Sequence, residues 1–298
     1  MSRWTAADIP DQSGRTVLVT GANSGLGLQT SLALARKGAR VLMACRNPQK
    51  AESALQRILD EVPNAEVELV SLDLASLASI ESAAEDVAGR VQQLDVLVNN
   101  AGVMAIPRSL TADGFEMQLG TNHLGHFALT GRLLPLLRRS SAPRVVTVAS
   151  TAHKPGTIRF DDLMGEQSYG RWSAYSQSKL ANLLFTGELD RRHGDWLTAA
   201  AAHPGYANTH LQSGQGNRLL EITMRLGNAV LAQSDAQGAW PQLYAATMPD
   251  VLGDDYYGPH LLELRGHPKK CDRTSKAKSR ADAARLWQVA QELTKVSY

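Results

Sequence analysis

The sequence predicts an α/β fold in which one central parallel sheet is doubly wound, with helices on both of its faces. Three observations support this prediction. Short runs rich in β-branched residues alternate along the chain with longer segments of helical periodicity. A glycine-rich turn joins the first of these runs to the first helical segment, as in a βαβ unit. No repeat, Pro/Ser-rich linker or change of composition divides residues 1–298, so we expect a single domain.

The expected strands and helices follow one another in regular order. The strands are residues 15–20, 40–44, 66–71, 95–99, 144–150 and 197–201, with 256–262 as a candidate last strand. The helices are a segment that ends at Gly38, then residues 49–59, 77–91, 115–138, 174–192, 235–246 and 281–293. Residues 151–174 are expected to form a loop or a short hairpin.

Three segments lie outside this regular pattern. Residues 1–13 and 265–298 are expected to be extensions at the two ends of the domain. Residues 206–233 carry Leu, Ile and Met at amphipathic spacing, which predicts either a small lid over a substrate or a helix packed permanently on the core. Between Lys269 and Arg285 seven basic residues accompany two acidic ones, and we expect a solvated, partly mobile segment there.

The composition is that of an ordinary globular protein, with 43% hydrophobic and 20% charged residues. A net charge of +2 gives no reason to expect a nucleic-acid partner. The two cysteines, Cys45 and Cys271, form no CxxC pair, so neither a disulfide framework nor a cysteine zinc site is expected. No run approaches the roughly 18 apolar residues of a membrane span, and the first residues do not resemble a signal peptide. We therefore expect a cytoplasmic enzyme without a membrane anchor.

The first glycine-rich turn has the spacing Gly21-x-x-x-Gly25-x-Gly27 and follows the first strand directly. A strand, a glycine turn and a helix in this order aim backbone N–H groups and a helix N-terminus at a phosphate. The spacing differs from the commoner G-x-G-x-x-G fingerprint, and a turn whose glycines serve only positive φ is the alternative.

The end of the second strand distinguishes between two dinucleotides. NAD sites usually place an acidic residue there, whereas NADP sites need room and positive charge for the 2′-phosphate. This strand ends without an acid and is followed by Arg46, whose guanidinium suits phosphate, so the pattern favours NADP(H) over NAD(H). A solvated surface arginine is the alternative. Asp73 and Leu74, after the third strand, are placed to meet an adenine.

The fourth strand ends in Asn99-Asn100-Ala101-Gly102, which either braces the sheet edge beside a cofactor or forms an ordinary turn. The following helix contains Asn122, a poor helix former in mid-helix, which indicates a role for its side chain or for a backbone-bound water. His123 and His126 lack the HExxH pattern and a nearby acid cluster, so they predict a structural role and no metal site.

Ser150 ends the fifth strand, at the edge where open α/β sheets bind ligands. Its neighbours do not form a G-x-S-x-G elbow, so a serine hydrolase is not expected. Tyr175 and Lys179 are four residues apart and share one face of the predicted helix. An ammonium beside a phenol favours the phenolate, so we expect Lys179 to lower the pKa of Tyr175 toward neutrality and make it a proton donor and acceptor. Alone, such a pair also occurs by chance in surface helices.

Taken together, these residues resemble the short-chain dehydrogenase/reductase family, over about residues 14 to 262. The resemblance is carried, in order, by Thr20-Gly-Ala-Asn-Ser-Gly-Leu-Gly27, Asn99-Asn-Ala-Gly102, Ser150, Tyr175-Ser-Gln-Ser-Lys179 and Pro204-Gly205. Within the family the chain is similar to the retinol dehydrogenase-like branch and to light-dependent protochlorophyllide reductases. The features that indicate this branch are Ala44-Cys-Arg-Asn47, Thr121-Asn-His-Leu-Gly-His-Phe127 and the long spacing from Ser150 to Tyr175.

The resemblance implies a Rossmann-type domain and a role for each site residue. Tyr175 would be the acid/base, and Lys179 would bind the nicotinamide ribose and depress the pKa of the tyrosine. Ser150 would hydrogen-bond the substrate oxygen, and Asn122 would hold a water in a proton relay to Lys179. The implied cofactor-binding residues are Gly21, Asn23, Ser24, Gly25, Leu26, Gly27, Arg46, Asp73, Leu74, Asn100, Ala101, Gly102, Tyr175, Lys179, Pro204, Gly205 and Thr209.

The implied reaction is reversible hydride transfer between NADP(H) and a small hydrophobic alcohol, aldehyde or ketone, without a metal. Two alternatives remain open: reduction of a C=C bond, as in protochlorophyllide reductases, and a non-catalytic NADP(H)-sensing protein. The family commonly forms homodimers or homotetramers through the helices that hold Asn122 and Tyr175. The front of this chain lacks the hydrophobic anchor of the vertebrate retinol enzymes, so a membrane-borne retinoid is not the expected substrate.

Overall fold

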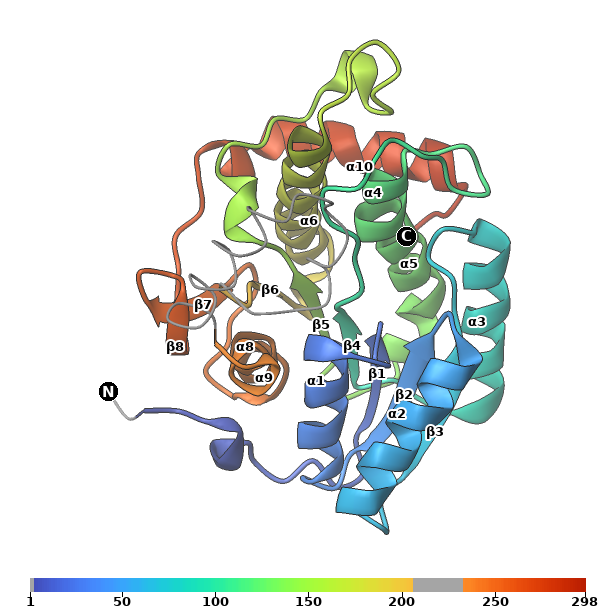
Figure 1. Ribbon diagram of the computed structural model, residues 1–298, viewed down its shortest axis with the longest axis vertical. Coiled ribbons are helices and arrows are strands. Elements are labelled where there is room, and N and C mark those ends of the chain that lie inside the picture. Colours follow the sequence, from blue (N-terminus) through green and yellow to red (C-terminus); the bar gives the residue numbers. More distant parts are fainter. Residues whose placement is uncertain (1–2, 206–232) are drawn as a thin grey trace, which may run out of the picture.

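The computed structural model describes residues 3–205 and 233–298, and an eight-stranded sheet forms its centre in the order β3-β2-β1-β4-β5-β6-β7-β8 (Figure 1). Neighbouring strands are parallel except for the last pair, β7 and β8. The strands are β1 Thr16–Thr20, β2 Arg40–Cys45, β3 Val67–Ser71, β4 Val96–Asn99, β5 Arg144–Val148, β6 Thr198–Ala202, β7 Tyr256–Leu261 and β8 Arg265–Lys270. The winding direction reverses between β1 and β4, which is the switch point where such sheets bind ligands.

Helices cover both faces of the sheet, as Figure 1 shows. They are α1 Gly25–Ala35, α2 Pro48–Glu61, α3 Leu77–Arg90, α4 Met117–Leu119, α5 Gly125–Leu137, α6 Arg171–His193, α8 Asp235–Gly238, α9 Trp240–Thr247 and α10 Arg280–Thr294. One hydrophobic cluster joins the sheet to α1, α2 and α9, and a second joins it to α3, α5, α6 and α10. Val17 and Val19 of β1 belong to the first cluster and Leu18 to the second, because successive strand residues point to opposite faces. The doubly wound α/β prediction is therefore confirmed.

One strand was not predicted. β8 has the sequence Arg-Gly-His-Pro-Lys-Lys, without a β-branched residue, and it forms because β7 turns back on itself. Leu262 and Glu263 make that turn with φ of 51° and 60°. The prediction of a solvated, partly mobile segment over 269–285 was wrong in part, because Lys269 and Lys270 belong to the sheet and the Arg273 side chain is only 9% exposed.

Two predicted helices are interrupted. The helix expected over 115–138 contains a widened π turn, Gly120–Leu124, between α4 and α5. The helix expected over 235–246 is divided into α8 and α9, because Pro241 lies in the first turn of α9 and cannot continue the preceding helix. The segment predicted as a loop over 151–174 is one up to Gly170, with two 3₁₀ turns, Thr151–His153 and Phe160–Asp162, and α6 begins at Arg171, earlier than predicted. Of the lid predicted over 206–233, only Gln233 lies within the described residues.

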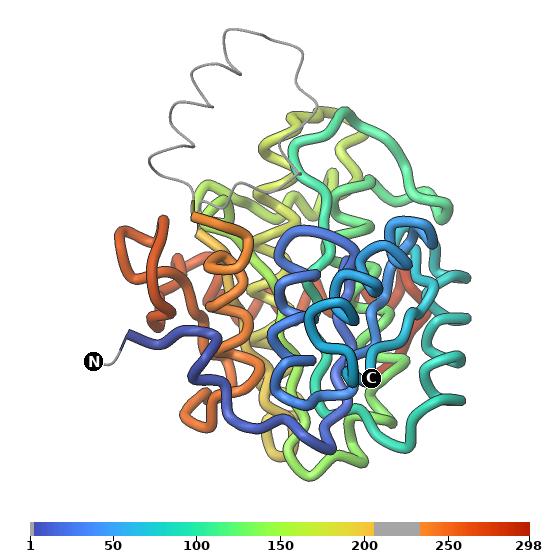
Figure 2. The backbone as a smooth tube through the Cα atoms, turned by 60° about the horizontal axis from the view of Figure 1, so that its bottom comes forward, coloured from blue at the N-terminus to red at the C-terminus, as the bar shows by residue number. Residues whose placement is uncertain are grey.

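The N-terminal segment runs beside the far end of the sheet, near β8 (Figures 1 and 2). Trp4 is 6% exposed, its indole Nε1 donates to Met248 Sδ at 3.2 Å, and its carbonyl lies 2.8 Å from His267 Nδ1. Ile9 is also buried. The N-terminal extension is thus packed onto the C-terminal part of the domain.

Candidate active site

The carboxyl ends of β1, β4 and β5 lie at one edge of the sheet because these strands are parallel neighbours. This arrangement brings the glycine turn after Thr20, the turn at Asn100 and the side chain of Ser150 together. α6 packs against β5 and carries Tyr175 and Lys179 to the same edge. Four segments that are far apart in the sequence therefore meet in one place.

Tyr175 and Lys179 share one face of α6, as predicted, with the amine nitrogen 5.8 Å from the centroid of the phenol ring. The Ser150 side chain is close enough to the Tyr175 phenol to favour its ionised form. Lys179 Nζ donates to the carbonyl of Val148 at 2.9 Å, and this bond ties α6 to the end of β5. Burial lowers the pKa of Lys179 to about 8, and among the described residues the amine forms no ion pair with a carboxylate.

The expected low pKa of Tyr175 is not found in the protein alone. Its side chain is buried, and burial raises the pKa of Tyr175 to about 12, although Ser150 beside it acts in the opposite direction. The free-energy cost of burying a phenolate exceeds the stabilisation that Ser150 gives it. The phenol is therefore protonated at neutral pH and is a proton donor.

Asn122 lies in the π turn, and this kind of helix defect is frequent at functional sites. Its Oδ1 accepts from the N–H of Val103 at 2.8 Å, and its amide nitrogen donates to Val103 O and Ser178 Oγ, both at 2.9 Å. A Cβ on Gly102 would lie 3.0 Å from Asn122 Oδ1 and 3.6 Å from Lys179 Nζ. A side chain at position 102 would therefore crowd both Asn122 and Lys179.

The first glycine turn has a backbone that favours glycine and keeps side chains away from the start of α1. Gly21 and Gly25 have φ of 66° and 52°, which favour glycine. A Cβ on Gly27 would lie 2.3 Å from Gly21 O, so this helix start can pack only without a side chain. Ser24, at the N-cap of α1, makes no capping hydrogen bond with its side chain, and this leaves the first N–H groups of α1 available to an anion.

Three further predicted residues complete this turn. Asn23 is half-buried and Leu26 is 9% exposed, at the start of α1. Asn100 donates from its amide to Thr20 O at 2.8 Å and so braces the end of β1 against the end of β4. The Asn100 side chain thus braces the sheet edge, which is one of the two roles considered for residues 99–102.

The rim of the site holds the residues expected to meet the adenosine. The Arg46 side chain is 70% exposed, and its Nη1 lies 3.9 Å from Asp73 Oδ1. Asp73 also accepts from the N–H of Ala75 at 3.0 Å, which holds its carboxylate in place. Leu74 is buried in the hydrophobic core.

On the opposite side of the site, Gly205 has φ of 69°, and a Cβ there would lie 2.3 Å from Leu264 O. The carbonyl of the preceding Pro204 accepts a hydrogen bond from the amide of Gln233. Thr209, the residue predicted to contact a carboxamide, lies outside the described residues.

Sequence reasoning missed two residues of the site. Trp172 is 54% exposed and lies edge-on to Tyr175, with ring centroids 6.1 Å apart; its position three residues earlier on the same helix could have indicated this. Gln242 of α9 is buried and donates to Asn100 Oδ1 at 3.1 Å and to Thr30 Oγ1. No local pattern predicts Gln242, because 142 residues separate it from Asn100.

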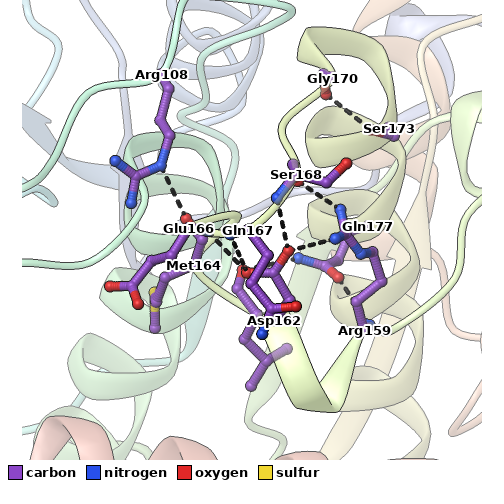
Figure 3. Close-up of polar contacts among 11 residues, drawn as sticks. Arg108, Arg159, Asp162, Met164, Glu166, Gln167, Ser168, Gly170, Ser173 and Gln177 are labelled. Atoms are coloured by element: carbon purple, nitrogen blue, oxygen red, sulfur yellow. Dashed lines mark hydrogen bonds and ion pairs between the residues drawn. The ribbon is translucent and has the colours of Figure 1, made fainter.

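The loop between Ser150 and Tyr175 is ordered by one carboxylate, as Figure 3 shows. Asp162 accepts hydrogen bonds from the N–H groups of Glu166, Gln167 and Ser168 and pairs with Arg159. Gln177 of α6 then accepts from the Arg159 N–H at 2.8 Å and donates to Leu163 O. The loop is therefore attached to the helix turn between Tyr175 and Lys179.

Comparison with known proteins identifies relatives across the whole fold. Residues 15–219 match the family model described as short chain dehydrogenase. Mouse retinol dehydrogenase 12 is 41% identical over 286 residues, which are 96% of this chain and 88% of that enzyme. Human retinol dehydrogenase 13 is 42% identical over 281 residues, covering 92% and 84% of the two chains.

Solved structures show the same fold. The crystal structure of an uncharacterized protein from Mycobacterium paratuberculosis is 46% identical and has a TM-score of 0.83, covering 100% of this chain and 99% of the other. A short chain dehydrogenase from Shigella flexneri, complexed with NADP, is 22% identical with a TM-score of 0.64 and covers 82% and 95% of the two chains.

These matches agree with the position of the glycine turn, Ser150, Tyr175 and Lys179 at one edge of a doubly wound sheet. The family model covers well over half of the chain, and the relatives match it over nearly its whole length. The chain belongs to the short-chain dehydrogenase/reductase family and is a retinol dehydrogenase-like oxidoreductase.

Proposed function

We propose that this oxidoreductase uses NADP(H) to interconvert a small hydrophobic alcohol and its aldehyde or ketone. The observation that carries the proposal is the convergence of Tyr175, Ser150 and Lys179 beside the glycine turn. A proton donor, a hydrogen-bond donor for a substrate oxygen and an amine thus surround one point at the ligand-binding edge.

Tyr175 gives its proton to the carbonyl oxygen of the substrate during reduction and takes it back during oxidation. Ser150 holds the same oxygen by a hydrogen bond. Lys179 stabilises the phenolate that remains after proton donation, and a water held by Asn122 returns the proton through Lys179. Because the buried phenol is protonated at neutral pH, the resting protein is prepared for reduction.

The dinucleotide supplies the hydride when it is bound. Its diphosphate would be held at the start of α1, where Gly21, Gly25 and Gly27 carry no side chain that would keep it from the backbone of the turn. Asn100, Ala101 and Gly102 would line its path, while Lys179 would bind the nicotinamide ribose and Pro204, Gly205 and Thr209 the carboxamide end.

The preference for NADP(H) rests on Arg46. Arg46 follows β2 directly, and the end of that strand carries no acidic residue to receive a ribose hydroxyl. The exposed Arg46 guanidinium lies beside Asp73, which follows β3. The ion pair with Asp73 is long, so Arg46 can reach a 2′-phosphate at little cost.

The preference for an apolar substrate rests on Trp172. An indole that is 54% exposed beside the proton donor offers an apolar wall to the part of the substrate next to its carbonyl.

No helix within residues 3–205 and 233–298 is long and apolar enough to cross a membrane. The cytoplasmic location and a homodimeric or homotetrameric state stay predictions.

The test is NADPH oxidation with a panel of hydrophobic aldehydes and ketones, retinal included, with NADH in parallel. Tyr175→Phe is expected to lower kcat by about 10²-fold to 10⁴-fold, because it removes the proton donor, while the Kd for NADPH changes little. Tyr244→Phe is the matched control, since the Tyr244 hydroxyl bonds Asp250 away from the site. A Tyr175→Phe enzyme that keeps its turnover would show that another group moves the proton. Tight NADPH binding by the wild type without turnover of any carbonyl would favour the sensor alternative.

A further inference from the structure

A buried hydrogen-bond network centred on a histidine adjoins the proposed proton relay. His126 of α5 is 1% exposed, and each of its ring nitrogens meets a different part of the site. Nδ1 lies 3.0 Å from the backbone carbonyl oxygen of Asn122, and Nε2 lies 2.9 Å from Thr20 Oγ1. Thr20 is the last residue of β1 and precedes the glycine turn directly.

The hydrogen bonds of this network have only one consistent direction. A carbonyl oxygen can only accept, so His126 Nδ1 carries the proton and donates to Asn122 O. In a neutral imidazole Nε2 is then an acceptor, and the Thr20 hydroxyl donates to it. Thr20 Oγ1 accepts in turn from the N–H groups of Asn100 and Ala101, both at 2.9 Å. The competing acceptor for the Thr20 hydroxyl, Val98 O, is more distant at 3.3 Å.

His126 is held in the neutral form that this direction requires. Burial lowers the pKa of His126 to about 4; the hydrogen bond to Asn122 opposes this shift, and the nearby Lys179 adds to it. The ring therefore keeps one protonated nitrogen throughout the neutral range.

The Asn122 carbonyl is the group on which this network acts. Both amide protons of Asn122 are engaged, with Val103 O and Ser178 Oγ, so Asn122 can offer a water only acceptors. His126 orients one of these acceptors, the backbone carbonyl in the π turn.

We propose that His126 is a positioning residue that holds the Asn122 carbonyl in the orientation needed by the proton relay to Lys179. Through Thr20 it also joins this carbonyl to the turns that bind the dinucleotide. This inference rests on the proposed function, because a positioning residue has a role only if the relay operates. The hydrogen bonds that hold the relay group in place matter for the rate, since a misplacement of about 1 Å can lower the rate about 10²-fold.

The structure offers a matched control three residues earlier. His123 is 2% exposed and packs against Phe127 and Phe185, with ring centroids 6.4 and 6.1 Å away. Within the described residues neither of its ring nitrogens makes a well-formed hydrogen bond, although Asn182 is close enough to favour its charged form. His123 is therefore a buried histidine of the same segment that does not belong to the network.

The test replaces each histidine by phenylalanine and measures kcat with a carbonyl that the wild type reduces, together with the Kd for NADPH. His126→Phe is expected to lower kcat by about 10-fold to 100-fold with little change in NADPH affinity, and His123→Phe to change neither. Two further variants cover the case in which His126→Phe does not fold. Asparagine can place an amide nitrogen where Nδ1 lies and is expected to restore most of kcat, whereas His126→Gln reaches only toward Thr20 and is expected not to.

Several outcomes would overturn the proposal. Full turnover by folded His126→Phe, equal losses in His126→Asn and His126→Gln, or a parallel loss of NADPH affinity and kcat would each remove the role in the relay. Nitrogen NMR of ring-labelled histidine gives a readout besides activity: the expected state is protonated at Nδ1, and protonation at Nε2 alone would overturn the proposal whether or not the protein turns over. A wild type that reduces no carbonyl would overturn the proposed function and this role together, whereas full activity in His126→Phe would overturn this role alone.

Discussion

Two buried charged groups of this protein are treated in opposite ways. At the candidate active site Lys179 is 4% exposed and donates to the carbonyl of Val148, with no carboxylate partner among the described residues. At the far end of the sheet the Arg273 side chain is 9% exposed, and its guanidinium donates to Asp254 Oδ1 at 2.6 Å and to the carbonyl of the same residue at 2.8 Å. Within residues 3–205 and 233–298, one cation is therefore buried without a counter-ion, and the other is buried with one.

This difference distinguishes a cation with a proposed role in catalysis, Lys179, from a cation that supports the fold, Arg273. An ion removed from water destabilises the fold unless a partner of opposite charge compensates it. Arg273 has that partner and connects the segment after β8 to the loop before β7. Lys179 has no such partner in the part of the chain that the structure describes, and the depressed pKa of its amine reflects the cost of burial. A fold retains such an unpaired charge where the charge has a function, so the contrast supports the role proposed for Lys179.

The largest effect is expected for Lys179→Met, which removes the unpaired cation and keeps the length of the side chain. Turnover should fall by about 10²-fold to 10⁴-fold, because the relay and the support of the phenolate are both lost. Stability should rise, since the shift of the Lys179 pKa from 10.5 to about 8 corresponds to an unfavourable term on the order of 3 kcal/mol at neutral pH. Kinetic assays measure the loss of turnover, and urea unfolding at pH 7 measures the gain in stability. A variant that is less stable than the wild type would refute the view that this charge is uncompensated.

The same contrast predicts a pH dependence. Below pH 8 Lys179 is charged in both the folded and the unfolded states, so its full cost is present. Between about pH 8 and 10.5 the folded protein releases this proton before the unfolded chain does, so the unfolded state binds more protons and the contribution of Lys179 to stability becomes less unfavourable. The stability advantage of Lys179→Met should thus be greatest below pH 8 and disappear above pH 10.5. Urea unfolding of both proteins across this range measures it, and an advantage that does not change with pH would come from packing.

Arg46 sharpens the comparison, because it is a cation of the site that is neither buried nor firmly paired. Arg46→Ala should weaken NADPH binding by about 10-fold to 100-fold and NADH binding little, since only NADPH carries the 2′-phosphate and a charge-assisted contact is worth about 1.5–3 kcal/mol. Stability should not change, because the side chain is 70% exposed. Titrations with both cofactors measure the ratio, and equal losses would show that Arg46 does not read the phosphate.

Most residues of the candidate site could be predicted from the sequence. Their pKa values and the structure at the β8 end of the sheet could not. Glycine turns at strand ends and a Tyr–Lys pair at helical spacing are local patterns, and parallel strands bring their ends together. The pKa of Tyr175 was predicted in the wrong direction, because the spacing to Lys179 is visible in the sequence while the burial that raises the pKa depends on the whole fold. The pairing of Arg273 with Asp254 was missed for the same reason, since it requires the β7–β8 turn that no β-branched residue announces.

Arg273→Met tests the compensated side of the comparison. It should leave kcat and both cofactor affinities near those of the wild type and lower the free energy of unfolding by about 1–3 kcal/mol. This range lies below that of a fully buried pair, because the Asp254 side chain is 41% exposed and water screens it. Urea unfolding gives the loss. A drop in activity at unchanged stability would place Arg273 in the site and remove the distinction between the two cations.

The smallest effect is expected a few residues further along the same basic segment. Lys278 pairs with Asp272, but the side chains are 50% and 86% exposed, so water already solvates both charges. Lys278→Met should therefore leave the urea midpoint and the kinetic constants unchanged within error. Because Arg273 and Lys278 carry the same charge and each has one carboxylate partner, a difference in stability between their methionine variants reports burial and not charge. Equal effects would mean that the pairing of Arg273 gains nothing from being buried, and the contrast with Lys179 would then have to rest on catalysis alone.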